Sequence, residues 1–476
     1  MVTRIAVVGG GVSGLVSAYR LRRLLGADAE LTVFESTGVT GGKLRTGTLA
    51  GRPFDLGAEA FLARRPEAVA LVRELGLDEE LVHPTGARAT VRAGAQARRL
   101  PPGTVMGVPA SADAVAGVLS PDGLAQVAAE ASLPPVDLPS KDVPLGGLLR
   151  SRFGDELVDR LVDPLLGGVY AGGADGLGLR ATMPGLAGAL DRGATSLTEA
   201  AASLVPASPS SAPVFGTLRG GLGALVERLA AASGAEIRTG TTVRELHRRD
   251  GGWRLVVGAA AAAHAPEESI VDFDAVLLAV PAPAARRLLA EVAPAASAAF
   301  AQVELASMAV IGLALPPGTE LPDASGVLVG ASEQRDDGRP FAVKAFTFSA
   351  RKWAHHTGEG APVLLRGSVG RFGEPGALHA DDGELVRLVL DDLAELTGVR
   401  AEPVDTVVTR WGGGLPQYGL GHTGLVEAIG RAVAEVPGLD VAGATLHGVG
   451  IPACVATADA AATRLAEFAK MDAWRG

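Results

Sequence analysis

Hydrophobic residues near the start of the chain change their spacing twice. Residues 4–8 form a short apolar run rich in β-branched side chains, which is typical of a buried parallel strand. Residues 15–25 then carry apolar side chains at helical spacing, and residues 31–34 return to a short apolar run. The pattern predicts a strand, a helix and a second strand, the unit from which parallel α/β sheets are built.

Helical spacing dominates much of the next 150 residues. A helix is predicted over 65–84, and the pattern from about 110 to 200 is helical, most clearly over 150–166. The glycine-rich stretch 167–173 is predicted to be a loop rather than a continuation of that helix.

A β-rich region follows, and the sheet signal returns near the end of the chain. A buried strand is predicted over 274–280, and a strand over 439–443 precedes a helix that extends to Phe468. This late strand–glycine–helix unit can return to the first sheet. Between these units, alternating segments predict a separate antiparallel sheet; they cover 307–315, 326–330, 341–349 and 363–370.

Two further elements complete the pattern. Residues 85–102 alternate and carry several arginines, which predicts a hairpin, and residues 385–396 predict an amphipathic helix. The order of elements therefore predicts an α/β protein with more than one domain.

The first strand ends in a glycine motif. Gly9, Gly11 and Gly14 satisfy G-x-G-x-x-G, and Glu35 ends the second strand about 20 residues later. Gly9 permits a tight turn, Gly11 lets a pyrophosphate approach the backbone, and Gly14 lets helix and strand pack closely. The helix N-terminus supplies N–H donors for the anion, and Glu35 would accept ribose hydroxyls. Because strand, helix, second strand and acid all occur in register, the motif predicts a dinucleotide site rather than a flexible loop.

The residues after Glu35 favour FAD over NAD. The pair Gly41-Gly42 allows another close approach of backbone to ligand, and Lys43 or Arg45 can neutralise a phosphate. A second motif follows at residues 54–59. Taken alone, a glycine hairpin with solvated basic residues is an equally good interpretation of residues 41–45.

Length, composition and charge restrict the class of protein. With 476 residues and 47% hydrophobic residues, the chain is long enough for two or three folded domains. Its net charge of −10 argues against a nucleic-acid partner, and the eight histidines show no metal-ligand spacing. The single cysteine, Cys454, cannot form an internal disulfide and is predicted to be an inert buried thiol.

The same features predict a soluble, cytoplasmic protein. No run of about 18 apolar residues lacks charge, so no transmembrane segment is expected, and a strand starting at Arg4 leaves no room for a signal peptide. The apolar loop Met106–Pro109 keeps peripheral contact with a membrane open.

These residues resemble the protoporphyrinogen/coproporphyrinogen oxidase family, within the amine-oxidase-like flavoproteins. The resemblance spans nearly the whole chain, and residues 103–109 look like the Gram-positive branch, which oxidises coproporphyrinogen III. Besides the motifs above, the segments that carry it are 165–172, 219–221, 278–281, 344–347, 352–353, 415–418 with 421–422, 441–443 and 448–451.

The resemblance implies a Rossmann-like FAD-binding domain, a mixed-sheet substrate domain and an inserted helical domain. The FAD-binding domain would be discontinuous, from residues 1–84, 205–290 and 436–476. The helical domain would cover 85–204 and the substrate domain 291–435.

It also implies the residues that contact a non-covalently bound FAD. By position these are Gly9, Gly10, Gly11, Val12, Ser13, Gly14, Leu15, Glu35, Ser36, Gly42, Lys43, Arg45, Gly57, Ala58, Glu59, Ala60, Val243, Trp411, Val449, Gly450 and Ile451. No metal site is expected, and no catalytic base is assigned, because the flavin supplies the difficult chemistry.

The implied reaction is the oxidation of coproporphyrinogen III to coproporphyrin III in haem biosynthesis. Oxygen would be the acceptor and hydrogen peroxide the by-product, and an enzyme that takes the product onward could be a partner. Protoporphyrinogen IX oxidation is the alternative; an amine oxidase and a flavin-binding protein without turnover follow. Arg88 and Lys344 are the candidate substrate contacts, although a solvated arginine in the hairpin is an equally good interpretation of Arg88.

Several conspicuous side chains have a simpler explanation than catalysis. Tyr170, Trp353 and Tyr418 are more often core aromatics than substrate contacts. His422 and His447 are expected to be structural hydrogen-bonding residues rather than bases.

Overall fold

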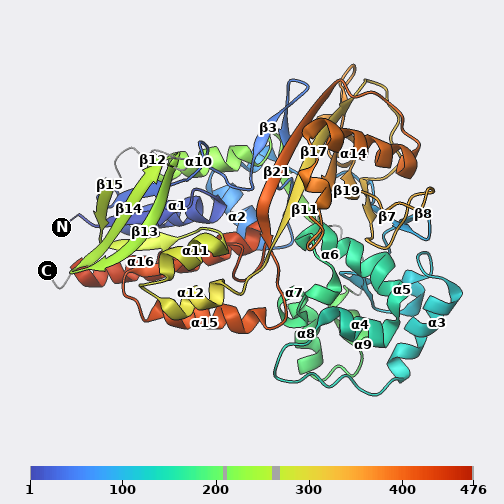
Figure 1. Ribbon diagram of the computed structural model, residues 1–476, viewed down its shortest axis with the longest axis horizontal. Helices are drawn as coiled ribbons and strands as arrows, with labels where there is room; N and C mark the ends of the chain where they lie inside the picture. The colour runs from blue at the N-terminus through green and yellow to red at the C-terminus, as the bar shows by residue number, and fades with distance from the viewer. Residues whose placement is uncertain (1, 207–211, 260–268, 474–476) are drawn as a thin grey trace.

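The computed structural model describes residues 2–206, 212–259 and 269–473. The molecule is elongated (Figure 1). A parallel sheet and both termini occupy one end, and a large mixed sheet and a helical region occupy the other.

The parallel sheet has five strands in the order β12-β2-β1-β16-β22. The bounds are β1 Arg4–Val8, β2 Glu30–Phe34, β12 Glu236–Arg238, β16 Ala275–Leu278 and β22 Leu439–Val441. All four pairings between neighbours are parallel. The predicted late strand therefore does return to the first sheet, beside β16.

Alternate residues of these strands enter two different cores. Ile5 and Val7 of β1 pack with helices on one face, whereas Ala6 and Val8 pack against the layer on the other. The first face is covered by α1 Val12–Leu25, α2 Pro66–Glu74, α10 Gly223–Ser233 and α16 Ile451–Ala473. The second face is covered by β13 Thr241–Arg249, β14 Gly252–Ala259, β15 Ser269–Phe273, α11 Ala282–Leu289, α12 Pro294–Phe300 and α15 His422–Ala434. Burial on both faces explains the unbroken apolar runs of the strands.

The large sheet has seven strands in the order β21-β17-β20-β19-β18-β7-β8. Its bounds are β7 Thr90–Ala93, β8 Gln96–Arg99, β17 Leu305–Leu315, β18 Gly326–Val329, β19 Val343–Thr347, β20 Val363–Val369 and β21 Asp405–Pro416. Neighbours pair antiparallel except β18 with β7, which makes the sheet mixed rather than purely antiparallel. The predicted hairpin at 85–102 is its edge, β7 and β8.

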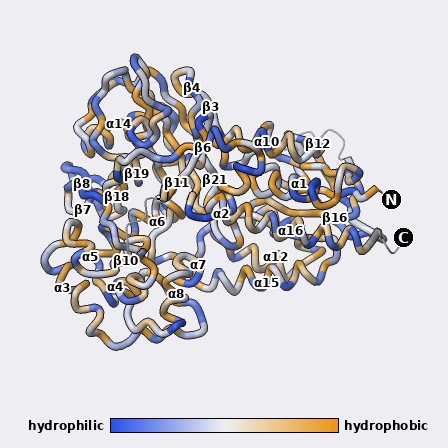
Figure 2. The backbone as a smooth tube through the Cα atoms, turned by 180° about the vertical axis from the view of Figure 1, so that it is seen from behind, coloured by the Kyte–Doolittle hydropathy of each residue, from blue (hydrophilic) through white to orange (hydrophobic). Residues whose placement is uncertain are grey.

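One face of this sheet packs on α14, Asp382–Thr397, where alternate residues of β17, β19 and β20 meet its apolar stripe. The opposite face packs on the hairpin of β3 Thr46–Leu49 and β4 Arg52–Asp55. In Figure 2 the edge strand β8 is drawn as hydrophilic, in agreement with four exposed residues.

The helical region lies beside the large sheet and has its own apolar core. Its helices are α3 Pro121–Ala129, α4 Leu145–Phe153, α5 Asp155–Leu157, α6 Asp163–Tyr170, α7 Leu179–Thr182, α8 Pro184–Asp191 and α9 Leu197–Leu204. Two details of the prediction are wrong. The helix expected over 150–166 is interrupted at Gly154, which has φ +79°, and the next helical segments continue to Tyr170 instead of ending before Gly167.

The remaining short strands link these parts. β5 Phe61–Leu62 and β6 Leu81–Val82 both pair with β11 Phe215–Leu218, and β9 Thr104–Val105 pairs with β10 Val108–Pro109. Val108 and Pro109 are buried, so the apolar loop expected near the surface contributes to the helical core. Among the helices of the described residues, none has the length and hydropathy needed to span a membrane.

Candidate active site

The glycine motif lies where β1 meets α1, at the carboxyl end of the parallel sheet. Gly9 has φ +107°, and its N–H donates to the Phe34 carbonyl over 2.8 Å. A Cβ at Gly9 would lie 2.3 Å from the Ala279 carbonyl oxygen, and one at Gly14 only 1.8 Å from the Gly9 oxygen. A Cβ at Gly11 would meet nothing closer than the Cα of Gly42, at 4.0 Å. Gly9 and Gly14 are therefore required by packing, whereas the space at Gly11 is left open.

The second glycine pair closes this loop from the other side. Gly11 and Gly41 form an isolated parallel bridge, and the Gly41 N–H donates to the Gly10 carbonyl over 2.8 Å. This contact favours a joint role over the alternative of an independent glycine hairpin. Ser36, Gly42 and Arg45 are exposed around it, Val12 and Ser13 are buried, and Leu15 lies wholly in the core.

Glu35 faces the loop from the end of β2. Its Oε2 accepts from the Gly10 N–H over 2.8 Å, and its Oε1 accepts from the Thr37 N–H over 2.7 Å. Thr241, at the start of β13, donates its N–H to the Glu35 carbonyl, which brings the buried Val243 into the same corner. A carboxylate held in this way at a strand end can accept a ribose hydroxyl.

Lys43 connects the loop to the residue 57–60 turn. Its carbonyl accepts from the Ala58 N–H over 2.9 Å, and a Cβ at Gly57 would lie 2.0 Å from that carbonyl oxygen. Within the described residues the Lys43 ammonium forms no ion pair, and burial lowers its pKa. A cation without a counter-ion beside an open glycine cradle suits an anionic ligand.

Two later segments complete the surroundings. Trp411 of β21 donates its indole N–H to the Leu56 carbonyl over 3.0 Å. The turn Val449-Gly450 leads into Ile451, the first residue of α16, and the nearby Cys454 carbonyl accepts from the Ser13 hydroxyl over 3.4 Å. Segments that are 440 residues apart in the sequence therefore meet at one site.

Glu59 points away from the glycine loop and towards the large sheet. Its carboxylate accepts from the Trp353 indole N–H and pairs with Arg366 at 2.8 Å and Lys352 at 3.4 Å. Burial opposes ionisation, but Arg366, Lys352 and Trp353 outweigh it and lower the pKa of Glu59 to about 2. The side chain is engaged by residues of the large sheet, so the predicted contact of Glu59 with the cofactor would have to be made by its main chain, beside that of Ala60.

Arg366 strengthens that connection. Besides Glu59, its guanidinium donates to the Gly57 carbonyl over 2.7 Å and to the Asp55 carbonyl over 3.2 Å. Asp55 in turn accepts from the Thr46 hydroxyl and the Leu222 N–H. Burial raises the pKa of Asp55 to about 7, although those hydrogen bonds oppose the shift. Asp55 had no predicted role; the only sequence signal was its position inside the 54–59 motif.

The two candidate substrate residues occupy different environments. Lys344, on β19, is 3% exposed, and its ammonium contacts the Ser368 hydroxyl at 2.7 Å. Arg88 precedes β7 and is exposed, as the simpler interpretation of this residue expects. The structure thus brings Lys344, and not Arg88, onto the inner face of the large sheet.

The conspicuous aromatics are buried, as expected of core residues. Trp353 and Tyr418 are 1% and 2% exposed, and Tyr418 stacks on His422 with ring centroids 4.0 Å apart. The Tyr418 hydroxyl donates to the Ala444 carbonyl, and His422 contacts the Leu446 carbonyl. These side chains fix the strand-to-helix connection that precedes α16.

Comparison with known proteins decides the family. The family model described as flavin containing amine oxidoreductase matches residues 12–466. The chain belongs to this family.

Relatives within it are similar over nearly their whole length. A coproporphyrinogen III oxidase from Mycobacterium tuberculosis is 45% identical over 461 residues, which cover 97% of each chain. A coproporphyrinogen III oxidase from Bacillus subtilis is 31% identical and 95% of each chain is covered. The crystal structure of a candidate protoporphyrinogen oxidase from Exiguobacterium sp. 255-15 has a TM-score of 0.83 and 31% identity, covering 98% of this chain and 99% of that one.

As a flavin containing amine oxidoreductase, the chain is an FAD-dependent enzyme, and its residues fit this cofactor. The cradle at Gly11 is open, Lys43 has no ion pair within the part of the chain that the structure describes, and α1 begins without a side-chain cap or an acidic residue in its first turn. These features leave N–H donors and positive charge for a pyrophosphate, with Glu35 for a ribose. The individual contact residues, and the absence of a covalent link, stay predictions.

Proposed function

We propose that this flavoenzyme oxidises coproporphyrinogen III to coproporphyrin III in haem biosynthesis, with oxygen as acceptor and hydrogen peroxide as by-product. The observation that carries the proposal is the similarity to coproporphyrinogen III oxidases over almost the full length of both chains. The macrocycle would lose six hydrogen atoms in three two-electron steps, each matched by reduction of one oxygen molecule to hydrogen peroxide. The bound flavin supplies the redox chemistry.

The protein's own contribution is to bind, orient and exclude water. Backbone N–H groups at the start of α1, with Lys43, would hold the cofactor phosphates, and Glu35 the adenosine ribose. The Glu59–Arg366 pair fixes the residue 57–60 turn against the large sheet, so the face of that sheet would form a wall beside a cofactor bound at this turn. A rigid wall aligns the macrocycle for hydride transfer.

We further propose that the enzyme works in the cytoplasm, with an enzyme that consumes the porphyrin as a transient partner. The bacterial relatives and the buried Val108–Pro109 segment support this location. Flotation with liposomes tests it, because firm, salt-resistant co-migration would contradict a cytoplasmic enzyme.

The proposal is tested by rates on two porphyrinogens with the FAD-loaded protein. We expect kcat/KM to be at least about tenfold higher for coproporphyrinogen III than for protoporphyrinogen IX, or about 1.4 kcal/mol of transition-state binding. Porphyrin fluorescence and hydrogen peroxide are followed together. Equal or better turnover of protoporphyrinogen IX would instead support the second candidate, which the Exiguobacterium structure favours.

A further inference from the structure

An irregularity in the large sheet determines where Lys344 points. Between β19 and β20, Val343 pairs with Val369 but Ala345 pairs with Ser368, so Lys344 is the extra residue of a β-bulge. Val343 and Phe346, on either side, pack in the α14 core. Bulges often redirect one side chain near a functional site. Here the bulge places the ammonium beside Ser368, on the face opposite α14.

The face of the large sheet opposite α14, here called the inner face, is partly accessible to solvent. Ala345 and Thr347 of β19, Arg366 and Ser368 of β20 and Met308 of β17 are all partly exposed. The residues that alternate with them on the α14 face are buried. Helix α6 contacts β18 and β19. Lys344, which is 3% exposed, lies among these partly exposed residues of the same face.

The Lys344 ammonium has no counter-ion among the described residues. Its contacts are the Ser368 hydroxyl at 2.7 Å and the Met308 sulfur at 3.9 Å. Other deeply buried charged groups are compensated: Arg92 by Glu333, and Asp392 by Arg335. Burying an ammonium without an anion is costly. Binding of an anion beside Lys344 would remove that cost, as the cofactor phosphates would remove it for Lys43.

A cofactor bound beside Trp411, as predicted, would lie too far from Lys344 to be this anion. Lys344, Ser368, Met308 and Trp411 occupy four neighbouring strands, β19, β20, β17 and β21. Strands are spaced about 4.8 Å apart, so Lys344 lies roughly 14 Å across the sheet from Trp411. Trp411 is a predicted cofactor contact, and it lies against the Leu56–Gly57 turn.

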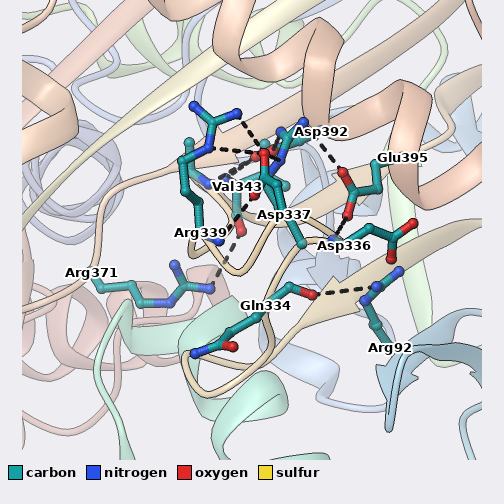
Figure 3. Close-up of polar contacts among 11 residues, drawn as sticks. Arg92, Gln334, Asp336, Asp337, Arg339, Val343, Arg371, Asp392 and Glu395 are labelled. Carbon is teal, nitrogen blue, oxygen red and sulfur yellow. Dashed lines mark hydrogen bonds and ion pairs between the residues drawn. The ribbon is translucent and has the colours of Figure 1, made fainter.

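A network on the far side of the strand fixes the bulge (Figure 3). The Asp392 carboxylate accepts from the Ala342 and Val343 N–H groups, over 2.8 and 2.9 Å. Arg335 pairs with Asp392, and Arg371 donates to the Val343 carbonyl over 3.4 Å. The residues just before Lys344 are therefore held in place, which suits an ammonium that recognises a ligand.

We infer that Lys344, with Ser368, binds a propionate carboxylate of the porphyrinogen and so sets the preference for a polycarboxylate substrate. The inference rests on the proposed function. One N–H of the Lys344 ammonium donates to the Ser368 hydroxyl, which leaves the other two to donate to the carboxylate. The nearby guanidinium groups of Arg366 and Arg371 add positive potential. Lys344 is thus a binding residue and takes no part in hydride transfer.

The test removes the charge at nearly constant volume. We expect K344M to weaken binding of coproporphyrin to the FAD-loaded enzyme at least about tenfold, measured by quenching of porphyrin fluorescence. With coproporphyrinogen, KM should rise by a similar factor while kcat changes less than about threefold. K344R, which keeps the cation, should recover part of the affinity. The control R387M removes an exposed cation from α14 and should behave as wild type.

The possible results separate the binding role from others. Unchanged porphyrin affinity in folded, FAD-loaded K344M would overturn the inference, as would a loss confined to kcat. If K344M does not fold, K344Q, which also removes the charge, carries the test, and wild-type affinity in that variant would overturn the inference. Failure of the proposed function looks different: wild-type protein would then neither bind coproporphyrin nor oxidise its porphyrinogen.

Discussion

The parallel sheet and the seven-stranded sheet contribute to the site in different ways. The parallel sheet offers the ends of its strands: glycines, main-chain N–H groups and a single carboxylate, Glu35. The seven-stranded sheet offers the middle of its strands, where Lys344, Arg366 and Ser368 project from one face. Backbone recognition suits a cofactor of fixed shape, whereas projecting side chains can be exchanged to suit a substrate. The comparison predicts that substitutions at the strand ends of the first sheet abolish or weaken cofactor binding, and those in the second sheet change substrate affinity or stability.

The largest effect should follow from a side chain at Gly11. Because a Cβ there meets only Gly42, at 4.0 Å, G11V should fold normally yet fill the space of the pyrophosphate. We expect no bound flavin after reconstitution and an almost unchanged melting temperature. G430A, in α15 with nothing near its Cβ, should retain full flavin content. A yellow G11V protein would refute backbone recognition at this loop.

The junction between the sheets is tested by E59Q. It leaves Arg366 and Lys352 without a buried counter-charge, so the free energy of unfolding should fall by about 3 kcal/mol. E67Q, whose partner Arg65 is largely exposed, should cost less than about 1 kcal/mol. Denaturant unfolding of FAD-loaded protein measures both. Equal losses would mean that Glu59 is no more important than a surface pair.

The contribution of Glu59 to stability should also depend on pH. The pKa of Glu59 is lowered from 4.5 to about 2, so its contribution is complete above pH 4.5 and is lost as the pH falls towards 2. The stability difference between wild type and E59Q should therefore shrink over that window. A difference that is constant with pH would contradict the ion-pair account.

A smaller effect is expected at the cofactor's ribose. E35A removes one charged hydrogen-bond acceptor and should weaken FAD binding by about 1–3 kcal/mol. Titration of the apoprotein with FAD measures this, and E30Q is the matched control, because Glu30 begins the same strand at its exposed end. FAD affinity equal to that of wild type would remove Glu35 from the site.

The smallest effect should come from D55N, and its pH dependence should be opposite to that of Glu59. Burial raises the pKa of Asp55 from 3.8 to about 7, so the protonated form stabilises the fold at low pH and that stability falls as the pH rises from about 4 to 7. A neutral amide should abolish this decline, with a change in the free energy of unfolding below about 1 kcal/mol at pH 4, measured by denaturant unfolding at a series of pH values. A stability of D55N below that of wild type at pH 7 would show that Asp55 is needed as an anion.

The sequence predicted the two sheets with unequal success. The sequence placed Gly9, Gly14 and Glu35 at a turn, a packing contact and a strand end, because each satisfies a local requirement there. The strand β21 was missed, since Gly412-Gly413-Gly414 within it suggests a turn, although pairing with β17 overrides that preference.

Other features depend on contacts that no local pattern contains. The bulge at Lys344 arises from register between distant strands, and the Glu59–Arg366 pair joins residues 307 positions apart. The helix through Gly167 to Tyr170 persists because Leu166 and Tyr170 enter the helical core, which local glycine propensity cannot reveal.

The return of β22 and α16 to the first sheet has a consequence for biosynthesis. During translation the N-terminal strand and glycine loop leave the ribosome first, but their partners β16 and β22 and the covering helix α16 are made hundreds of residues later. Until then the apolar faces of α1 and β1 lack their cover. Stable loading of FAD must therefore be post-translational, and nascent or prematurely terminated chains should depend on chaperones to avoid aggregation.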